Sequence, residues 1–205
     1  MARCFIFAGG SFDGFFDQIK EGDLVIGADK GYTYARENDI DLDYIIGDFD
    51  SSTKPLGDNV LILKPIKDYT DTVEAINLAR KKGYKKIIIY GGLGGRESHT
   101  IANIRALYHF KKKGIDISLK AKGKEIFIID DKLSYPYEGK DFYVSIFSLT
   151  NITRGLTIKG LFYELNSYDL SMDDLITVSN QTKGRDFSIS IKEGALVVVF
   201  EDFNL

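Results

Sequence analysis

The stretch Tyr44-Ile45-Ile46-Gly47-Asp48-Phe49-Asp50-Ser51 decides the fold of this chain and narrows its chemistry. Its first three residues are apolar and form a run of the length expected for a buried strand. Two carboxylates therefore follow where a strand ends, which is where ligands bind in an open α/β sheet. On an extended backbone Asp48 and Asp50 point to the same side, with their Cα atoms roughly 6–7 Å apart.

Two acids held this close repel each other unless a cation lies between them. A hard divalent metal ion such as Mg²⁺ prefers oxygen ligands, and phosphate oxygens can complete its coordination. Ser51 adds either a hydroxyl ligand or a cap for the turn that follows. The segment therefore predicts a loop at a strand end that binds metal and phosphate.

The composition is that of an ordinary globular protein. The chain has 205 residues, enough for one large domain or two small ones with real cores. Its net charge of −3 argues against a broad nucleic-acid-binding surface. The basic run Lys111–Lys113 ends a predicted helix, where positive charge suits the helix dipole. We interpret this run as a solvated helix end and expect no nucleic-acid partner.

Cys4 is the only cysteine, so the chain cannot form an internal disulfide. This fits a reducing compartment, and we expect a cytoplasmic protein. Cys4 lies in a short apolar strand, where we expect it to belong to the core and not to act as a nucleophile. The run 3–8 is too short for a signal-peptide core or a membrane span, so we expect no membrane partner.

The first part of the chain alternates strand-like and helix-like segments. This alternation implies parallel strands joined by crossover helices, and apolar strands such as Ile87–Ile89 fit burial on both faces. The last helix is expected to be amphipathic, with an apolar stripe of Ile101, Ile104, Leu107 and Tyr108. Strands are expected at 3–8, 24–28, 44–47, 60–63, 86–90 and 116–120, and helices at 32–37, 72–82 and 100–113.

After about Ala121 no long helical period remains, and turn-prone residues separate short β-type runs. This half predicts an antiparallel sandwich or partial barrel. We therefore expect an α/β N-terminal domain with a mostly parallel sheet, residues 1–122, followed by a C-terminal antiparallel β-sandwich, residues 123–205. Strands of the second half are expected at 125–129, 143–147, 156–159, 162–165, 176–179, 187–191 and 195–200.

A second acidic loop, Lys67-Asp68-Tyr69-Thr70-Asp71-Thr72-Val73-Glu74, follows the fourth predicted strand and opens a helix. A helix start offers unpaired N–H groups and partial positive charge, which suit phosphate. Lys67 is a candidate phosphate contact, and Asp68 and Asp71 are candidate metal ligands. The alternative is a capping box formed by Asp71 and Glu74. The first acidic loop leaves the same end of the same predicted sheet, which favours the binding role.

The segment Gly91-Gly92-Leu93-Gly94-Gly95-Arg96-Glu97-Ser98-His99 follows the fifth predicted strand. Clustered glycines let backbone N–H groups approach phosphate closely, and Arg96 supplies a planar fork for phosphate oxygens. His99 and Asn103 are four residues apart and so share one helix face, where His99 serves either as a cap or as a ligand. At the end of the second strand, Asp29 is a candidate for binding a ribose, a metal or a helix N-terminus.

These loops, in this order, resemble those of the thiamin pyrophosphokinase (thiamin diphosphokinase) family, and the resemblance spans nearly the whole chain. The Gly-Asp-Phe-Asp-Ser segment followed by Lys-Asp-x-Thr-Asp is specific, whereas either motif alone is not. The matching segments are Ala28–Gly31, Ile46–Ser51, Lys67–Glu74, Gly94–His99 with Asn103, Gly160–Tyr163 and Val178–Asn180.

The resemblance implies an enzyme that transfers pyrophosphate from ATP to the hydroxyl of thiamin in a Mg²⁺-dependent reaction, giving thiamin diphosphate and AMP. It also implies an N-terminal nucleotide-binding catalytic domain, a C-terminal thiamin-binding domain, and a homodimer with the active site at the subunit interface. Catalytic roles are expected for Asp48, Asp50, Asp71, Lys67 and Arg96, with the three aspartates as metal ligands. Substrate contacts are expected at Asp29, Asp68, Thr70, Gly92, Gly94, Gly95, His99, Asn103, Ser179 and Asn180.

The chain departs from the family pattern at two positions. Ser98 stands where the family commonly has aspartate, which removes a charge next to His99, and Lys30 replaces a frequent glycine. The chain has no tryptophan, so aromatic stacking on thiamin has to come from tyrosine or phenylalanine. Three alternatives therefore stay open: a related pyrophosphokinase acting on a hydroxymethyl-pterin alcohol, a metal-dependent nucleotide hydrolase, and a catalytically weak nucleotide- or thiamin-binding protein.

The metal interpretation makes a testable prediction. Asp50→Asn keeps the size of the side chain but removes the charge that a divalent cation requires. We expect turnover to fall by orders of magnitude while the melting temperature stays nearly unchanged. Steady-state kinetics in Mg²⁺ buffer and thermal unfolding of the same sample measure both. A large loss of stability with normal residual activity would contradict the metal role.

Overall fold

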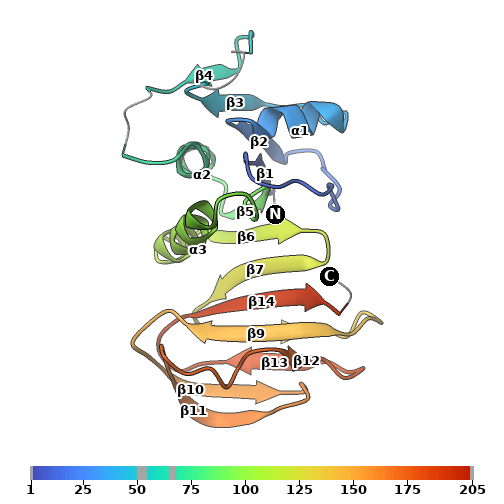
Figure 1. The fold of residues 1–205 in the computed structure, drawn as a ribbon, viewed down its shortest axis with the longest axis vertical. Coiled ribbons are helices and arrows are strands. Elements are labelled where there is room, and N and C mark those ends of the chain that lie inside the picture. Colours follow the sequence, from blue (N-terminus) through green and yellow to red (C-terminus); the bar gives the residue numbers. More distant parts are fainter. Residues whose placement is uncertain (1, 50–54, 65–67, 204–205) are drawn as a thin grey trace. The chain divides into compact units, whose positions relative to one another are not determined.

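The computed structural model describes residues 2–49, 55–64 and 68–203. Asp50, Ser51 and Lys67, which the sequence marks as candidate site residues, lie outside the described residues. The chain divides into two compact units, Met1–Lys122 and Gly123–Leu205 (Figure 1). The first is an α/β unit and the second is built from antiparallel strands, as the sequence predicts.

In the first unit the sheet is parallel throughout, with strand order β6-β5-β1-β2-β3-β4. Figure 1 shows α2 and α3 on one face of this sheet and α1 on the other, as right-handed crossovers require. The strands are β1 (Cys4–Phe7), β2 (Leu24–Ala28), β3 (Tyr44–Gly47), β4 (Val60–Ile62), β5 (Lys86–Tyr90) and β6 (Asp116–Ala121). The helices are α1 (Gly31–Glu37), α2 (Asp71–Lys81) and α3 (Glu97–Lys111).

The central strands are buried on both faces, which explains their continuous apolar sequences. Every residue of β1 and β2 is buried. Phe5 and Phe7 pack with Tyr90 and with Phe15 of the segment that follows β1. Cys4 is fully buried, and burial raises the pKa of its thiol, so the expectation of a core cysteine is confirmed.

Helix α3 differs from its prediction in both its start and its buried face. It begins at Glu97, three residues before the expected start, and Ile101 is 55% exposed, so the predicted stripe is wrong there. The buried residues of the helix are Asn103, Leu107 and Phe110. Asn103 can be buried because its amide group donates a hydrogen bond to a backbone carbonyl, which offsets the cost of removing it from water.

An ion-pair network that local sequence patterns do not predict fixes the segment between β1 and β2. The Tyr90 hydroxyl donates a hydrogen bond to Asp17 at 2.5 Å, and Lys120 Nζ lies 2.9 Å from the same oxygen. Arg3 contacts the other carboxylate oxygen at 3.6 Å. Burial by itself raises the pKa of Asp17, but these hydrogen bonds and charges outweigh it, so the pKa lies below its ordinary value.

The second unit packs two antiparallel sheets face to face. One has the strand order β12-β9-β14-β7 and the other β11-β10-β13-β8. The strands are β7 (Lys124–Ile129), β8 (Lys132–Tyr135), β9 (Phe142–Ser148), β10 (Ile152–Lys159), β11 (Leu165–Ser171), β12 (Asn180–Gln181), β13 (Phe187–Ser190) and β14 (Leu196–Asp202).

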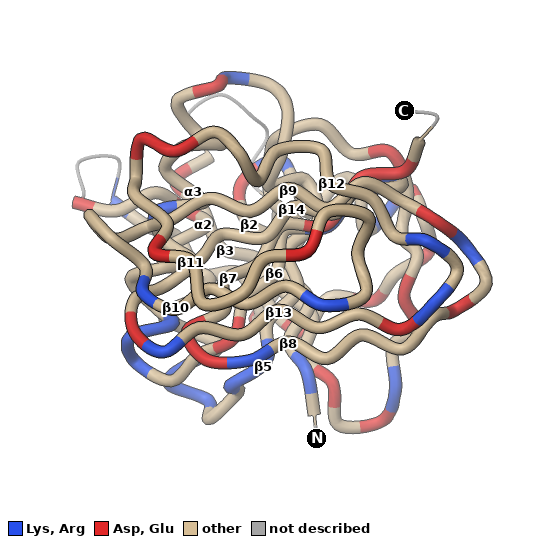
Figure 2. Tube along the Cα trace, turned by 90° about the horizontal axis from the view of Figure 1, so that it is seen from below, with Lys and Arg blue, Asp and Glu red and all other residues tan. Residues whose placement is uncertain are grey.

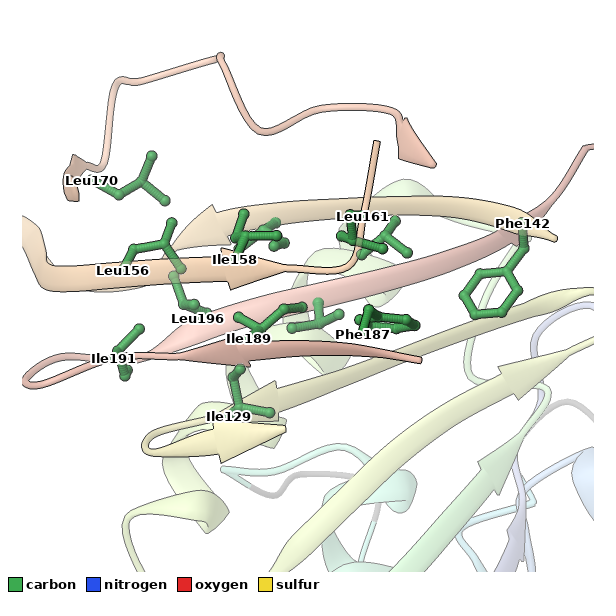
Figure 3. Packing of buried hydrophobic residues seen from close by; sticks show 13 residues of the cluster. Ile129, Phe142, Leu156, Ile158, Leu161, Leu170, Phe187, Ile189, Ile191 and Leu196 are labelled. Carbon is green, nitrogen blue, oxygen red and sulfur yellow. The ribbon is translucent and has the colours of Figure 1, made fainter. Parts of the chain in front are cut away.

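The core of the second unit lies between these sheets (Figure 3). Leu156 and Ile158 of β10, Ile189 of β13 and Leu196 of β14 belong to this core, and all four are at most 1% exposed. In β13, for example, Phe187 and Ile189 are buried and the serines between and after them are not, so alternate residues face this core.

Two predicted strands of the second unit are wrong. Residues 162–164 form a bend that precedes β11, and residues 176–179 form a turn before β12. Both segments are rich in β-forming residues, but their apolar side chains are exposed and do not pair in a ladder. Conversely, β8 and the edge strand β11 were missed. In β11 only Leu170 is buried, so its sequence carries no apolar alternation.

Acidic and basic residues are interspersed along the trace, many of them in loops and at strand ends (Figure 2). This agrees with the small net charge of the sequence. Among the residues that the structure describes, no helix combines the length and apolar character needed to cross a bilayer.

The Asp17 network predicts a pH-dependent stability difference. Because the folded-state pKa of Asp17 is lowered, its stabilisation is present above the ordinary carboxyl pKa of about 4 and is lost as pH falls through the folded value. We expect Asp17→Asn to lower the free energy of unfolding by about 1–3 kcal/mol at pH 7, with the difference shrinking below about pH 4.

Urea titrations across that pH range measure this difference. Asp116→Asn is the matched control, because Asp116 pairs with Lys111 at 2.7 Å but is 69% exposed. It should cost less than about 1 kcal/mol at any pH. A pH-independent loss for Asp17→Asn would contradict the electrostatic origin of the effect.

Candidate active site

A cavity of about 550 Å³ lies at the carboxyl ends of the parallel strands of the first unit. Residues that follow β1, β2, β3, β4 and β5 all contribute to its wall, so it occupies the position that the first acidic loop predicts. The lining residues are Ala8, Gly9, Gly10, Asp29, Asp48, Asp68, Tyr69, Thr70, Asp71, Thr72, Gly91, Gly92, Gly94, Gly95, Arg96, His99 and Asn103.

The loop after β1 belongs to the site, and our reading of the sequence missed it. The Gly10 N–H donates to the Gly91 carbonyl at 2.8 Å, and the Ser11 N–H donates to the Leu93 carbonyl at 3.0 Å. A Cβ on Gly10 would lie 2.5 Å from the Gly91 oxygen, so only glycine fits here. The signal available in the sequence was Gly9-Gly10 directly after an apolar strand, the same pattern as in the loop after β5.

The glycine loop after β5 presents unused backbone donors. In the described part of the chain, the N–H groups of Gly92, Gly94 and Gly95 donate to no other residue. Gly91 has φ +68°, and a Cβ there would lie 2.3 Å from the Ala8 oxygen, so glycine is required. Arg96 is the N-cap of α3, is exposed, and makes no side-chain capping bond. Free N–H groups, a helix N-terminus and a guanidinium together suit an anion.

Helix α2 is capped at its N-terminus by Thr70 and not by Asp71. The Thr70 Oγ1 accepts a hydrogen bond from the Val73 N–H at 3.4 Å, and Asp71 is the first helical residue. The alternative of a capping box between Asp71 and Glu74 is therefore wrong. With the cap supplied by Thr70, the half-buried Asp71 lines the cavity instead.

The structure brings acidic side chains from three loops, those after β2, β3 and β4, to one cavity. Asp29, Asp48, Asp68 and Asp71 all line it. The N–H of Asp29 donates to the Ile46 carbonyl at 2.8 Å, which ties the end of β2 to β3. Among the described residues, no group of three acidic, histidine or cysteine side chains lies close enough to hold a metal ion. Asp50, the third predicted ligand, is outside the described residues.

The residues around the start of α3 divide into two groups. Arg96 and His99 line the cavity, whereas Glu97 and Ser98 are exposed and do not. Neither Ser98 nor its neighbour Glu97 therefore brings a carboxylate into the cavity beside His99. Asn103 reaches the cavity wall but is only 8% exposed, and its Nδ2 donates to the Gly92 carbonyl at 2.7 Å.

The two candidate residues of the second unit have different surroundings. Asn180 is 5% exposed, its Oδ1 accepts from the Tyr163 N–H at 2.9 Å, and its Nδ2 donates to the Tyr163 carbonyl at 2.7 Å. It holds the bend 162–164 in place. Ser179 is exposed, and its N–H donates to Ser145 Oγ. Phe162 and Tyr163, which are 58% and 67% exposed, were not among the candidates.

Comparison with known proteins agrees with the resemblance in the loops. Residues 16–119 match the family model "Thiamin pyrophosphokinase, catalytic domain", and residues 132–196 match "Thiamin pyrophosphokinase, vitamin B1 binding domain". Thiamine pyrophosphokinase of Bacillus subtilis is 28% identical over 187 residues, which cover 87% of each chain. Thiamin pyrophosphokinase 1 of Caenorhabditis elegans is 24% identical over 148 residues, 67% of this chain and 61% of that protein.

Solved structures agree with these matches. The crystal structure of thiamine pyrophosphokinase from Bacillus subtilis superposes with a TM-score of 0.88 at 26% identity, covering 98% of this chain and 99% of that one. The structure of thiamin pyrophosphokinase from Geobacillus thermodenitrificans superposes with a TM-score of 0.84 at 21% identity. The match covers 100% of this chain and 99% of that one, and it supports the fold.

The two family models together span most of the chain, and the catalytic-domain model alone spans half of it. That model includes the acidic loops after β3 and β4 and the glycine loop after β5. The chain therefore belongs to the thiamin pyrophosphokinase family, and it is an enzyme of the thiamin diphosphokinase class.

Proposed function

We propose that the protein transfers the pyrophosphoryl group of ATP to the primary hydroxyl of thiamin in a Mg²⁺-dependent reaction, giving thiamin diphosphate and AMP. One observation carries the proposal: a single cavity contains both acidic side chains and unused backbone donors beside Arg96. A polyphosphate with a bound divalent cation satisfies both sides of such a cavity, because the acids face the cation and the donors face the phosphate oxygens.

The acids of the cavity fit Mg²⁺ in chemical type. Asp48 and Asp71 are half-buried residues of neighbouring loops that offer oxygen ligands, and among the described residues neither cysteine nor methionine lines the cavity. With Asp50, they are the residues that we propose to hold the ion. When bound, Mg²⁺ would neutralise charge on the phosphates and polarise the transferred group.

The phosphate chain is held from the other side by the protein itself. The N–H groups of Gly92, Gly94 and Gly95 and the start of α3 supply fixed donors, and Arg96 supplies a positive charge that stabilises the transferring group. Lys67 is assigned the same role by its motif. His99 lines the cavity one helical turn before Asn103 and can bond a phosphate or ribose oxygen.

The transfer is a substitution at the β-phosphorus. The thiamin oxygen forms a bond to the β-phosphorus, the bond from that phosphorus to the α,β-bridging oxygen breaks, and AMP leaves with the electron pair. The hydroxyl proton goes to a base, for which we propose Asp68, because it is exposed and lines the cavity. The main contributions of the protein are alignment of the two reactants and neutralisation of charge.

We assign acceptor binding to the second unit, residues 123–205, and nucleotide binding to the first, residues 1–122. The match to a vitamin B1 binding domain lies in the second unit. Phe162 and Tyr163 present two exposed rings with centroids 5.3 Å apart, on a bend that Asn180 fixes. Aromatic heterocycles such as those of thiamin stack on such rings. In this proposal Ser179 contacts thiamin, and Asn180 acts by holding the bend.

We further propose that the enzyme is a homodimer whose active site lies at the subunit interface. The supporting feature is the segment 172–179, where the usual burial pattern is reversed. Leu175, Ile176 and Val178 are 75%, 58% and 44% exposed, whereas Thr177 is 3% exposed. Thr177 bonds Ile146 through both its backbone and its hydroxyl, so the turn is fixed with apolar groups outward. Several exposed apolar side chains on one short fixed segment are typical of an interaction surface.

The assigned reaction is tested by measuring AMP release from ATP in Mg²⁺ buffer with and without thiamin. We expect AMP formation that depends on thiamin and stops when EDTA removes the divalent ion. A hydroxymethyl-pterin alcohol serves as the control acceptor and should give no AMP. ATP breakdown that ignores both alcohols would favour a hydrolase, and nucleotide binding without turnover would favour a binding protein.

The dimer is tested by Leu175→Asp, which places a charge at the centre of the apolar segment. We expect the dimer dissociation constant to rise about 30-fold or more, since burying one leucine contributes about 2 kcal/mol and an unpaired buried carboxylate adds a further cost. Light scattering after gel filtration at several concentrations measures it. Leu56→Asp is the control, because Leu56 is 93% exposed in the first unit. A monomeric wild type with full activity would exclude the shared active site.

A further inference from the structure

The two glycine loops of the cavity are tied to each other and each is also held from a helix. The backbone bonds join Gly10 to Gly91 and Ser11 to Leu93. Beyond these, Tyr34 of α1 bonds Gly10 in the loop after β1, and Asn103 of α3 bonds Gly92 in the loop after β5. Tyr34 is not among the candidate site residues that the sequence predicts.

Tyr34 is directed at the first loop by its packing. Its hydroxyl donates to the Gly10 carbonyl at 2.9 Å. Its ring stacks on Phe12 with centroids 5.1 Å apart and an interplanar angle of 9°, and Lys30 Nζ lies 5.5 Å from the ring centroid. A ring held on a neighbouring ring cannot easily turn its hydroxyl elsewhere. Tyr34 does not line the cavity, so it acts on a ligand only through the loop.

Because peptide groups are planar, the contact of Tyr34 with Gly10 also affects the orientation of the glycine loop after β5. In a trans peptide the C=O and the following N–H point in opposite directions, and the described chain contains no cis peptide. Tyr34 fixes the Gly10 carbonyl, so the Ser11 N–H faces the other way, where it donates to the Leu93 carbonyl. The Leu93 carbonyl and the Gly94 N–H belong to the same peptide group. The bond from Ser11 therefore also fixes the direction of the Gly94 N–H, which points away from Ser11.

The same reasoning applies to three consecutive carbonyls of the loop. The Gly91 oxygen accepts from the Gly10 N–H, the Gly92 oxygen from Asn103 Nδ2, and the Leu93 oxygen from the Ser11 N–H. Each bond orients the N–H that follows it in the chain. Two of these, on Gly92 and Gly94, belong to residues that line the cavity and donate to no other described residue. Asn103 holds the peptide group between them, whose N–H belongs to Leu93.

We propose that Tyr34 and Asn103 are positioning residues that hold the amide groups of the glycine loop in the orientation that binds the phosphate chain of the nucleotide. The inference rests on the proposed function for the identity of the nucleotide. It concerns the recognition of a polyphosphate anion, whichever group that anion carries. Preorganised donors bind an anion more tightly than mobile ones, because the loop is not ordered again on binding.

Tyr34→Phe is the first variant, because it keeps the stacked ring and removes one hydrogen bond. We expect the dissociation constants of Mg·ATP and of inorganic tripolyphosphate to rise by the same factor, about 5- to 10-fold. Equal factors show that the contact acts on phosphate and not on the base or ribose. Calorimetric titration measures both. Tyr84→Phe is the matched control, since its hydroxyl also donates to a glycine carbonyl, that of Gly22, at 2.9 Å but away from the cavity.

Asn103→Asp is the second variant, because it removes the donor and places a carboxylate against the Gly92 carbonyl. We expect a rise of at least about tenfold in KM for ATP, with KM for thiamin unchanged. Asn59→Asp is its matched control, since Asn59 Nδ2 donates to the Leu42 carbonyl at 2.9 Å. Both control variants should bind tripolyphosphate as the wild type does.

The outcomes separate this inference from the proposed function. A wild type that binds tripolyphosphate, with Tyr34→Phe within twofold of it, overturns the positioning role. A loss of tripolyphosphate affinity that is matched by Tyr84→Phe, or accompanied by an equal loss of thiamin affinity, shows a merely structural role and also overturns it. If only tripolyphosphate binds and Tyr34→Phe weakens it, the positioning role stands and the nucleotide assignment fails. A wild type that binds neither anion overturns both.

Discussion

The backbone hydrogen bonds between the loops after β1 and β5 are the constraint on which the first unit depends for its binding site. They join Gly10 to Gly91 and Ser11 to Leu93, between strands that are adjacent in the sheet but about 80 residues apart in sequence. The close approach requires glycine at positions 10 and 91, because a Cβ at either would overlap a carbonyl oxygen. The carbonyls of the loop after β5 are paired, whereas N–H groups of the same loop remain available to a ligand. The cavity that these N–H groups line is also lined by the acids that follow β2, β3 and β4.

Burial in this protein departs from hydrophobicity at several polar residues that bond the backbone of a loop or turn. Asn103, Thr177 and Asn180 are buried and hydrogen-bonded to the backbone. Ile101 and Ile176, which lie close to the first two in sequence, are exposed, and so is Tyr163, whose backbone Asn180 bonds. A buried amide that satisfies a carbonyl fixes a loop in one conformation, and the apolar groups turned outward remain available for binding. The same pattern caused the wrong assignments at 101, 162–165 and 176–179, where local periodicity competed with contacts made far away in the chain.

Much of the fold could be read from local patterns. The strands at 24–28, 44–47 and 86–90 have the predicted limits, because continuous β-branched and apolar runs between turn signals describe a strand buried on both faces. The edge strand β11 was missed because its side chains are mostly polar and only Leu170 is buried. Of the candidate site residues that the structure describes, those of the first unit all line one cavity. This is because carboxyl ends of neighbouring parallel strands meet at one edge of the sheet.

The sequence by itself determined the family, the order of the acidic and glycine-rich loops, and the type of ligand that these loops suit, since each of these follows from residues close together in the chain. Only the tertiary structure decided that Gly9 and Gly10 belong to the site, that Thr70 caps α2, and that the amides of Asn103 and Asn180 face the backbone. The physical reason is that a polar side chain takes its role from its hydrogen-bond partner. For Asn180 and Tyr34 that partner lies 17 and 24 residues away, beyond any local pattern.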